Sequence, residues 1–456
     1  MAVGFKNFFL ELINQFNSHS ITYAVMRNYQ PLPDSTAGSD IDLLFTETEK
    51  EQAIKCVYIA AKKTNAVVWG QSDSVQFSKV FILGQPDSTD MKWWGCCLDL
   101  NFGLCFRGMP YLYEEFGSLR QLFKGFQVLK KGPAAVLGII KELLNNDHLP
   151  EKYLMDAVNF HKIERQTVQS MLAPMGDAFF DLYESLLFDP EFNIELGTNK
   201  FRNIFTSSVL RKKPWAYFRC SVTNLSYKFL RYLRPSGKIV AFLGVDGAGK
   251  STVINAIKPI LDEVTHNTVT IKHLRPGLLP PLSDLANKLR RKEPKNKMTF
   301  TPVVQPHAAK PSGTLGSLFR VFYLLLDYTV GYWLYSRVFI AKQPGLVIFD
   351  RFADDIYLDP ARFRISLNKN ILATLVRFTP RPDYIFCLFG APLLIHDRKK
   401  ELPLTEVVRQ IDALVEYSRQ NSNSILIDTT QGNILDTRDI VLNALSKLPS
   451  KTSDTI

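Results

Sequence analysis

An eight-residue string in the second half of the chain has the residue types and spacing of a phosphate-binding loop. It runs from Gly244 to Ser251 with the sequence GVDGAGKS and fits the pattern G-x-x-x-x-G-K-[ST]. Its glycines, Gly247 and Gly249 included, let backbone N–H groups converge on phosphate oxygens, and the start of the following helix adds positive potential. Lys250 supplies an ammonium group for the β- and γ-phosphates, and a hydroxyl follows it as a ligand for Mg²⁺. The string therefore predicts a site for ATP or GTP with Mg²⁺.

Carboxylates near the start of the chain form a second group that could do chemistry. Asp40 and Asp42 stand two residues apart in the extended run GSDIDLLF, so strand alternation directs both to one face. Asp99 lies in another apolar run, CLDLNF. Two or three convergent carboxylates are what a Mg²⁺ site for nucleotidyl transfer requires, which makes all three candidate metal ligands. The alternative is that this part of the chain has the same strands but no catalytic activity.

The elements that must position these residues follow from hydrophobic periodicity. After Gly237, apolar runs alternate with helical segments, which predicts an α/β fold with a parallel sheet between two helical layers. The expected strands are 239–243, 268–273, 346–349, 384–388 and 424–427, and a helix is expected at 250–263. Residues 1–110 show an α+β pattern, and helix-period residues dominate from 111 to 206. We therefore expect three regions, namely 1–110, 111–236 and 237–456.

The segment 207–236 is basic and aromatic. It holds seven Lys or Arg residues and no acid, interleaved with side chains such as Trp215 and Phe229. It is either a connecting helix with a solvated basic face or an interfacial segment on anionic lipid. A second basic stretch, 287–313, is polar and contains proline, which predicts a mobile insertion.

Composition narrows the class of protein. A chain of 456 residues with 46% hydrophobic and 22% charged residues is typical of a globular protein of two or three domains. Its net charge of +11 favours anionic partners, and no specific nucleic acid is expected. Six cysteines without a CxxC pair predict buried thiols, and the start shows no secretory pattern. The apolar segment 317–341 is interrupted by charges, so we expect a largely buried helix and no membrane span. We also expect a cytoplasmic protein, with a peripheral position at the inner membrane face as the alternative.

Residues 237–450 resemble the thymidylate kinase family. The string FLGVDGAGKST, ending at Thr252, is similar to that family's F-x-G-x-D-G-x-G-K-S-T. This resemblance implies an ATP- and Mg²⁺-dependent kinase in which Thr252 belongs to the nucleotide site and Asp246 faces the acceptor. HLRPG is similar to the family's R-x-P-G turn, which implies that Arg275 binds the acceptor.

Two further strings extend the resemblance. VIFDRF is similar to the family's D-R-[YH] motif, which implies that Asp350 lies near the metal and Arg351 holds the acceptor phosphate. HDRKK resembles the arginine-containing lid, which implies that Arg398 closes over the transferring phosphate. The expected catalytic residues are thus Lys250, Asp350, Arg351 and Arg398, with Ser251 and Asp350 as metal ligands.

The acceptor is less closely defined than the phosphate donor. The strings LRPGLLP, DYTVGYW and FDRFADDIYLDPARFR also resemble thymidylate-kinase-like proteins of bacterial polysaccharide clusters, and residues 1–110 resemble the nucleotidyltransferase superfamily. We expect a nucleoside-monophosphate kinase that uses dTMP or a similar acceptor. The alternatives are a kinase or transferase for a saccharide or lipid-linked acceptor and a nucleotide-binding regulator without turnover.

Overall fold

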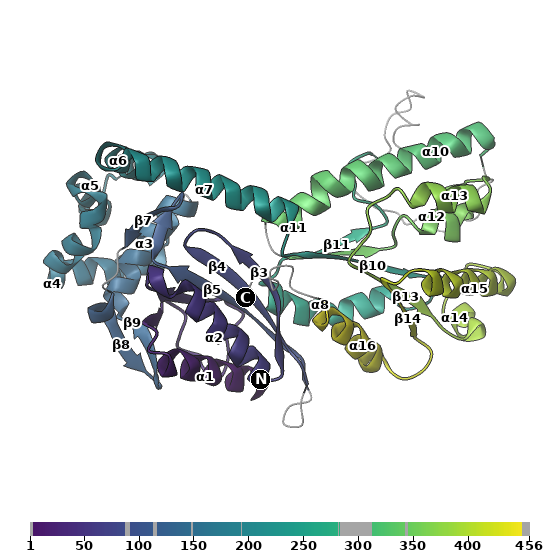
Figure 1. Ribbon diagram of the computed structural model, residues 1–456, viewed down its shortest axis with the longest axis horizontal. Coiled ribbons are helices and arrows are strands. Elements are labelled where there is room, and N and C mark those ends of the chain that lie inside the picture. Colours follow the sequence, from purple (N-terminus) through teal and green to yellow (C-terminus); the bar gives the residue numbers. More distant parts are fainter. Residues whose placement is uncertain are drawn as a thin grey trace. The chain divides into compact units, whose positions relative to one another are not determined.

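A computed structural model describes residues 3–448, except 87–91, 113–115, 147–148, 193, 281, 283–311 and 343–344. The predicted insertion at 287–313 therefore lies almost wholly outside the described residues. The chain divides into two compact units, one ending at Leu233 and the other beginning at Arg234 (Figure 1). Each unit contains its own sheet and its own hydrophobic core.

The second unit is built on a five-stranded parallel sheet, as its sequence predicts. The strand order is β11-β12-β10-β13-β14, and every neighbouring pair is parallel. The strands are β10 Lys238–Gly244, β11 Val269–His273, β12 Leu346–Asp350, β13 Tyr384–Phe389 and β14 Ser424–Asp428. The central strand β10 is buried along its whole length, which explains its continuous run of apolar residues.

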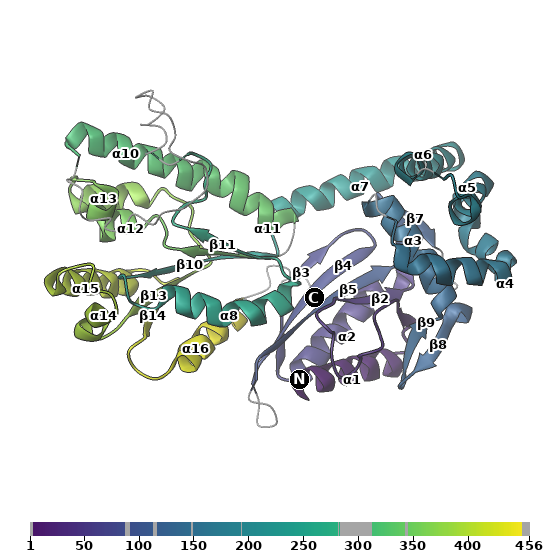
Figure 2. The same cartoon turned by 180° about the vertical axis from the view of Figure 1, so that it is seen from behind.

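Helices cover both faces of this sheet (Figures 1 and 2). On one side, α8 Lys250–Thr265 packs beside α16 Ile434–Ser446. On the other, Ile239, Ala241 and Leu243 of β10 join one core with the helices that follow β11, β12 and β13. Those helices are α10 Thr314–Leu326, the π-helix η5 Asp327–Arg337, α11 Val338–Lys342, α12 Asp355–Leu358, η6 Pro360–Phe363, α13 Lys369–Val376 and α15 Leu404–Gln420, while α14 Pro392–Arg398 follows β13.

The apolar segment 317–341 is buried along one side only, which corrects the expectation of a largely buried helix. Val321 and Tyr328 face the core at 1% and 0% exposure, whereas Phe322 and Trp333 are 67% and 46% exposed. The reason is helical geometry, because only one face of a helix is turned toward the sheet. The apolar residues on its other faces are therefore exposed. Within the described residues, no helix combines the length and hydropathy needed to cross a membrane.

The first unit contains a seven-stranded mixed sheet in the order β3-β4-β5-β2-β1-β9-β8. Strands β8 and β9 lie beyond residue 110, so the sheet of this unit continues into the region expected to be helical. The strands are β1 Tyr23–Val25, β2 Ile41–Phe45, β3 Ala66–Asp73, β4 Phe77–Gly84, β5 Trp94–Phe102, β8 Arg120–Phe123 and β9 Phe126–Leu129, with a separate hairpin of β6 Leu104–Phe106 and β7 Met109–Leu112.

Alternate residues of this sheet enter two different cores. Leu43 and Phe45 pack under α1 Val3–Ser18 and α2 Lys50–Lys63, whereas Leu44 faces the helices that follow the sheet. The later helices are α3 Lys131–Asn146, α4 Leu154–Leu172, α5 Asp177–Phe188, α6 Ile194–Lys212 and α7 Pro214–Leu233, and short 3₁₀ turns lie at Glu47–Glu49, Gly117–Leu119, Glu151–Tyr153 and Ala173–Met175.

Candidate phosphate-binding site

The glycine-rich string forms the turn that joins β10 to α8, where its sequence places it. Gly247 and Gly249 have left-handed backbones with φ of +90° and +85°. A Cβ atom on Gly247 would lie 2.8 Å from the carbonyl oxygen of Ile395, so both conformation and space require glycine there. The turn ends directly at the first residue of α8, Lys250, so the N–H groups at the start of that helix point toward the strand end.

Lys250 is buried within this turn. Its Nζ donates to the carbonyl oxygens of Gly244, at 2.8 Å, and Val245, at 3.1 Å. Burial and the nearby positive charge of Arg351 lower the pKa of Lys250 to about 8, although Asp350 and Asp246 oppose this shift. An anionic ligand beside Lys250 would favour its charged form.

Asp350 and His273 end the adjacent strands β12 and β11. His273 Nδ1 lies 3.2 Å from Asp350 Oδ2, whereas Asp350 Oδ1 is buried without a hydrogen-bond partner among the described residues. Burial raises the pKa of Asp350, but the hydrogen bond from His273 and the charge of Lys250 outweigh it and bring the pKa below its ordinary value. An ionised carboxylate with a free oxygen, near the Ser251 hydroxyl in the same cavity, fits the oxygen donors that Mg²⁺ prefers.

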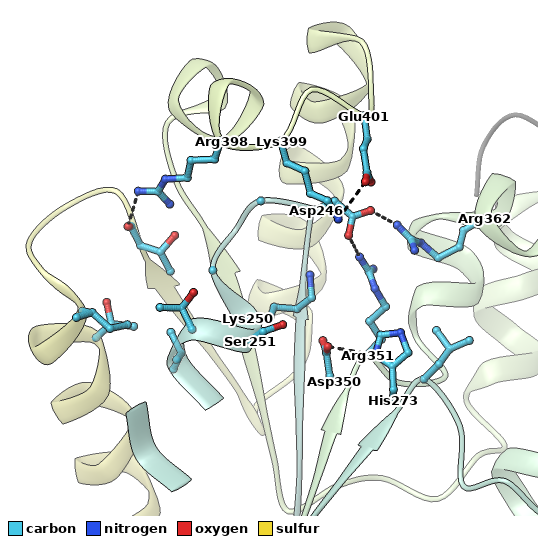
Figure 3. Close-up of a pocket in the computed structure, with 18 of the residues that line it drawn as sticks. Asp246, Lys250, Ser251, His273, Asp350, Arg351, Arg362, Arg398, Lys399 and Glu401 are labelled. Atoms are coloured by element: carbon cyan, nitrogen blue, oxygen red, sulfur yellow. Dashed lines mark hydrogen bonds and ion pairs between the residues drawn. The ribbon is translucent and has the colours of Figure 1, made fainter. Parts of the chain in front are cut away.

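Two arginines meet on Asp246. Arg351 Nη2 lies 2.6 Å from Asp246 Oδ1, and Arg362 pairs with the other carboxylate oxygen (Figure 3). Arg351 also contacts Asp355 Oδ2 at 2.9 Å, and its φ of +79° places a non-glycine residue in the left-handed region. Burial opposes ionisation of Asp246, but the two arginines hold its pKa far below the ordinary value. A strained, doubly paired arginine at a strand end is typical of a functional site.

These side chains line one cavity of about 1110 Å³ at the carboxyl ends of the parallel strands. Nine predicted residues line it, namely Asp246, Gly247, Gly249, Lys250, Ser251, Thr252, Asp350, Arg351 and Arg398. Arg398 reaches it from α14 and donates to the carbonyl oxygen of Thr429 at 3.3 Å. Gly244 contributes through its carbonyl bond to Lys250.

Arg275 does not line this cavity in the structure. Its Nη1 lies 3.2 Å from Oδ2 of buried Asp327, while Asp327 Oδ1 accepts from the Leu278 amide at 2.8 Å. The hydroxyl of Tyr328 donates to the carbonyl of Leu274. These contacts hold the turn after β11 against the π-helix η5. Residues 274–280 and 327–333 therefore pack against each other. A direct contact between Arg275 and an acceptor stays a prediction.

Sequence reasoning assigned no role to four ionisable residues of the cavity, His273, Arg362, Lys399 and Glu401. Arg362 is the most informative, because its side chain is 15% exposed and pairs with both Asp246 and Asp359. A signal was present: Asp359 precedes Pro360 at the start of a short 3₁₀ turn, and that turn places Arg362 opposite the phosphate-binding loop.

The carboxylates of the first unit come together, but with cationic partners. Asp42 and Asp99 are register partners on β2 and β5. Asp42 pairs with Arg27 and with Lys141, whereas Lys79 Nζ lies 3.2 Å from Asp99 Oδ1 and 3.9 Å from Asp40 Oδ2. Within the described residues, no group of three or more acidic, histidine or cysteine side chains could hold a metal ion. A Mg²⁺ site at Asp40, Asp42 and Asp99 stays a prediction.

Comparison with known proteins adds only distant structural similarities to this geometry. No family model and no curated protein matches the chain. Among solved structures, thymidylate kinase from Ehrlichia chaffeensis has 16% identity and a TM-score of 0.30, with 46% of this chain and 99% of that chain covered. Thymidylate kinase from Candida albicans has 16% identity and a TM-score of 0.32, with 47% and 95% covered. At such values, activity and substrate must be argued from the site.

Proposed function

We propose that the second unit is an ATP- and Mg²⁺-dependent phosphotransferase whose acceptor is a nucleoside monophosphate such as dTMP. The observation that supports it most is the single cavity in which the phosphate-binding turn, Lys250, Asp350 and the Arg351–Arg362 pair converge. Phosphoryl transfer needs positioning and neutralised charge more than covalent catalysis, and this cavity offers both.

The residues divide into a donor side and an acceptor side. In this proposal the turn amides and Lys250 hold the triphosphate, and Arg398, which lines the same cavity, would neutralise the transferring phosphate. Asp350 and Ser251 would hold Mg²⁺, which neutralises charge on the phosphate oxygens. Asp246 fixes Arg351 and Arg362 in place to receive the acceptor phosphate. Because that phosphate already carries an ionised oxygen, no general base is required.

The test is an acceptor panel with purified full-length protein and Mg·ATP. ADP release and a phosphorylated product are expected with a nucleoside monophosphate, and dTMP is the first choice. A panel that also contains phosphosugars separates the acceptor classes. Binding of Mg·ATP without transfer to any acceptor would refute the proposed kinase and favour a nucleotide-binding regulator.

One observation favours the second candidate, a saccharide or lipid-linked acceptor used at a membrane surface. In the basic segment 207–236, helix α7 exposes a series of large apolar side chains, with Trp215 at 81%, Leu225 at 68% and Phe229 at 62%. Exposed apolar residues among Lys and Arg fit the headgroup region of an anionic bilayer. The acceptor panel with phosphosugars and glycolipids decides between the two candidates.

A further inference from the structure

The two arginines of the proposed acceptor side have three carboxylate partners between them. Arg351 donates from Nη1 to Asp355 Oδ2 at 2.9 Å and from Nη2 to Asp246 Oδ1 at 2.6 Å. Arg362 donates from Nε to Asp359 Oδ2 at 3.1 Å and pairs through Nη2 with the second oxygen of Asp246. The two arginines therefore share Asp246, whereas Asp355 and Asp359 each pair with one of them.

These carboxylates lie on different sides of the arginines. Asp246 lines the cavity of the proposed kinase site, with 13% of its side chain exposed, and projects between the two guanidinium groups (Figure 3). Asp355 and Asp359, at 4% each, do not belong to that lining. Asp359 also accepts a hydrogen bond from the backbone amide of Arg362 at 3.4 Å. An anion in the cavity thus meets the arginines from the side that Asp246 occupies.

Charge makes Asp246 the exchangeable partner. Asp355 balances Arg351 and Asp359 balances Arg362, so the carboxylate of Asp246 is the surplus negative charge of the group. A phosphate added beside this carboxylate would meet a like charge at close range, which is unfavourable in a buried site. A phosphate that replaces it would keep charge-assisted hydrogen bonds with both guanidinium groups. The arginines keep their other partners during this exchange, so only the Asp246 side chain has to rotate.

We infer that Asp246 occupies the anion site of Arg351 and Arg362 in the free protein, and that a phosphate monoester group of the acceptor replaces it there. This inference rests on the proposed function, because it requires an acceptor that carries a phosphate. It also narrows the class of acceptor. A dianionic phosphate can displace a carboxylate from two guanidinium groups, whereas the neutral hydroxyl of an unphosphorylated saccharide cannot. Asp246 therefore discriminates against neutral acceptors.

Titration calorimetry of the full chain with inorganic phosphate tests the exchange. The donor side is first saturated with Mg²⁺ and a non-hydrolysable ATP analogue, so that phosphate can bind only elsewhere. Asp246→Asn should strengthen phosphate binding at least about tenfold, because phosphate then no longer competes with a carboxylate. Adding Arg362→Gln to Asp246→Asn should reverse this gain, because the second guanidinium group is then absent.

The matched control is Asp359→Asn, which removes the same charge from the same group of residues but from outside the cavity. It should not strengthen phosphate binding, since Arg362 then loses the carboxylate that holds it. If its melting curve shows that this variant does not fold, Asp355→Asn makes the same comparison behind Arg351.

Two results would overturn the inference while the proposed function stands. One is phosphate binding to Asp246→Asn that is no tighter than to the unaltered chain. The other is an equal gain in the control variant, which would indicate a general effect of charge. Failure of the ATP analogue to bind is a different result, because it would refute the proposed function itself and with it this inference.

Discussion

Lys250 combines deep burial with a positive charge, a pairing that is unfavourable unless an anion compensates it. Its hydrogen bonds go to two backbone carbonyls of the turn, at 2.8 and 3.1 Å. A polyphosphate beside the turn would supply the missing negative charge. Lys250→Ala should therefore weaken Mg·ATP binding at least about 100-fold, as expected for loss of about 3 kcal/mol of charge-assisted bonding.

The control for that variant lies on the same helix. Lys258 pairs with Asp262 at the i,i+4 spacing and lies outside the cavity lining, so Lys258→Ala should keep the affinity of the unaltered chain. Titration calorimetry measures both. Equal affinities for the two variants would show that Lys250 does not contact the nucleotide.

The lowered pKa of Lys250 gives binding a pH signature. Because the free protein has a pKa of about 8 here and the unfolded chain has about 10.5, the native state binds fewer protons between these values. A bound phosphate restores the charged form, so binding should take up close to one proton above pH 8 and affinity should fall as pH rises. Burial of the charged Lys250 ammonium destabilises the folded state fully below pH 8. This destabilisation decreases as pH rises from 8 toward 10.5, because the folded state then loses the charge.

Calorimetry at pH 9 in buffers of different ionisation enthalpy measures the proton uptake directly. Lys250→Met should abolish it while leaving any other coupled protonation in place. An uptake that persists unchanged in Lys250→Met would assign the proton to another group.

Arg362 is expected to act on the acceptor and not on ATP. It pairs, together with Arg351, with Asp246, a residue that the proposed function places on the acceptor side. Arg362→Gln should raise the KM for the acceptor about tenfold or more, since a charge-assisted bond contributes roughly 1.5–3 kcal/mol, and should leave the KM for ATP within twofold. Arg364→Gln, two residues along and exposed, is the control. A selective rise in the KM for ATP would contradict this assignment.

At the residue scale, the sequence is sufficient to predict those site residues that belong to one contiguous motif. The loop from Gly244 to Ser251 and the Asp350–Arg351 pair each occupy one turn or strand end, so their spacing alone defines them. Arg362 and His273 join the cavity through contacts with Asp246 and Asp350, which lie far from them in the sequence. Arg275 shows the opposite case, because buried Asp327 holds a side chain that its motif assigns to a ligand.

At the scale of elements, α7 is the helix whose exposed face has the clearest consequence. Its apolar residues Leu225 and Phe229 are 68% and 62% exposed, and the segment around it contains no acid. Liposomes with anionic lipid should co-sediment the protein, neutral liposomes should do so weakly, and salt should reduce the effect. Leu225→Glu combined with Phe229→Glu should abolish it.

The control is Ile163→Glu on α4, a residue that is 81% exposed and lies outside the basic segment. It should leave sedimentation unchanged. Failure of the unaltered chain to sediment with anionic vesicles would remove the membrane-surface candidate and leave the soluble acceptor.

Strands of the second unit could be predicted because burial on both faces gives continuous apolar runs. All five expected strands coincide with β10 to β14 within one residue at each end. In the first unit, β8 is partly exposed and carries the mixed pattern RQLF, whereas residues 80–84 of β4 are buried and apolar. Their place in the sheet depends on pairing with distant strands, so the sequence did not reveal them.

At the scale of the whole molecule, the two units have separate cores and should respond separately to change. Asp42 is fully buried and paired with Arg27 and Lys141, so Asp42→Ala removes a carboxylate that two cations share. Arg27 keeps Glu142 as a partner, so Lys141 is the cation left without its carboxylate, and the variant should destabilise the first unit by about 3 kcal/mol. Mg·ATP should raise only the melting transition of the second unit.

Differential scanning calorimetry resolves these two effects. In Asp42→Ala, one transition should move down and the nucleotide-responsive transition should stay within about one degree of its original temperature, because the two units have separate cores. Kinase turnover measured below the first transition should also persist. If both transitions fall together, or turnover is lost, the two units are coupled.

Transfer of an isotopically labelled γ-phosphoryl group from ATP to an acceptor tests the central claim most directly. With dTMP and related monophosphates in the presence of Mg²⁺, mass spectrometry should find the label in the acceptor for the unaltered chain and for Lys258→Ala, and none for Lys250→Ala. Label transfer that survives Lys250→Ala, or absence of any Mg·ATP binding by the unaltered chain, would contradict a phosphotransferase built on this loop.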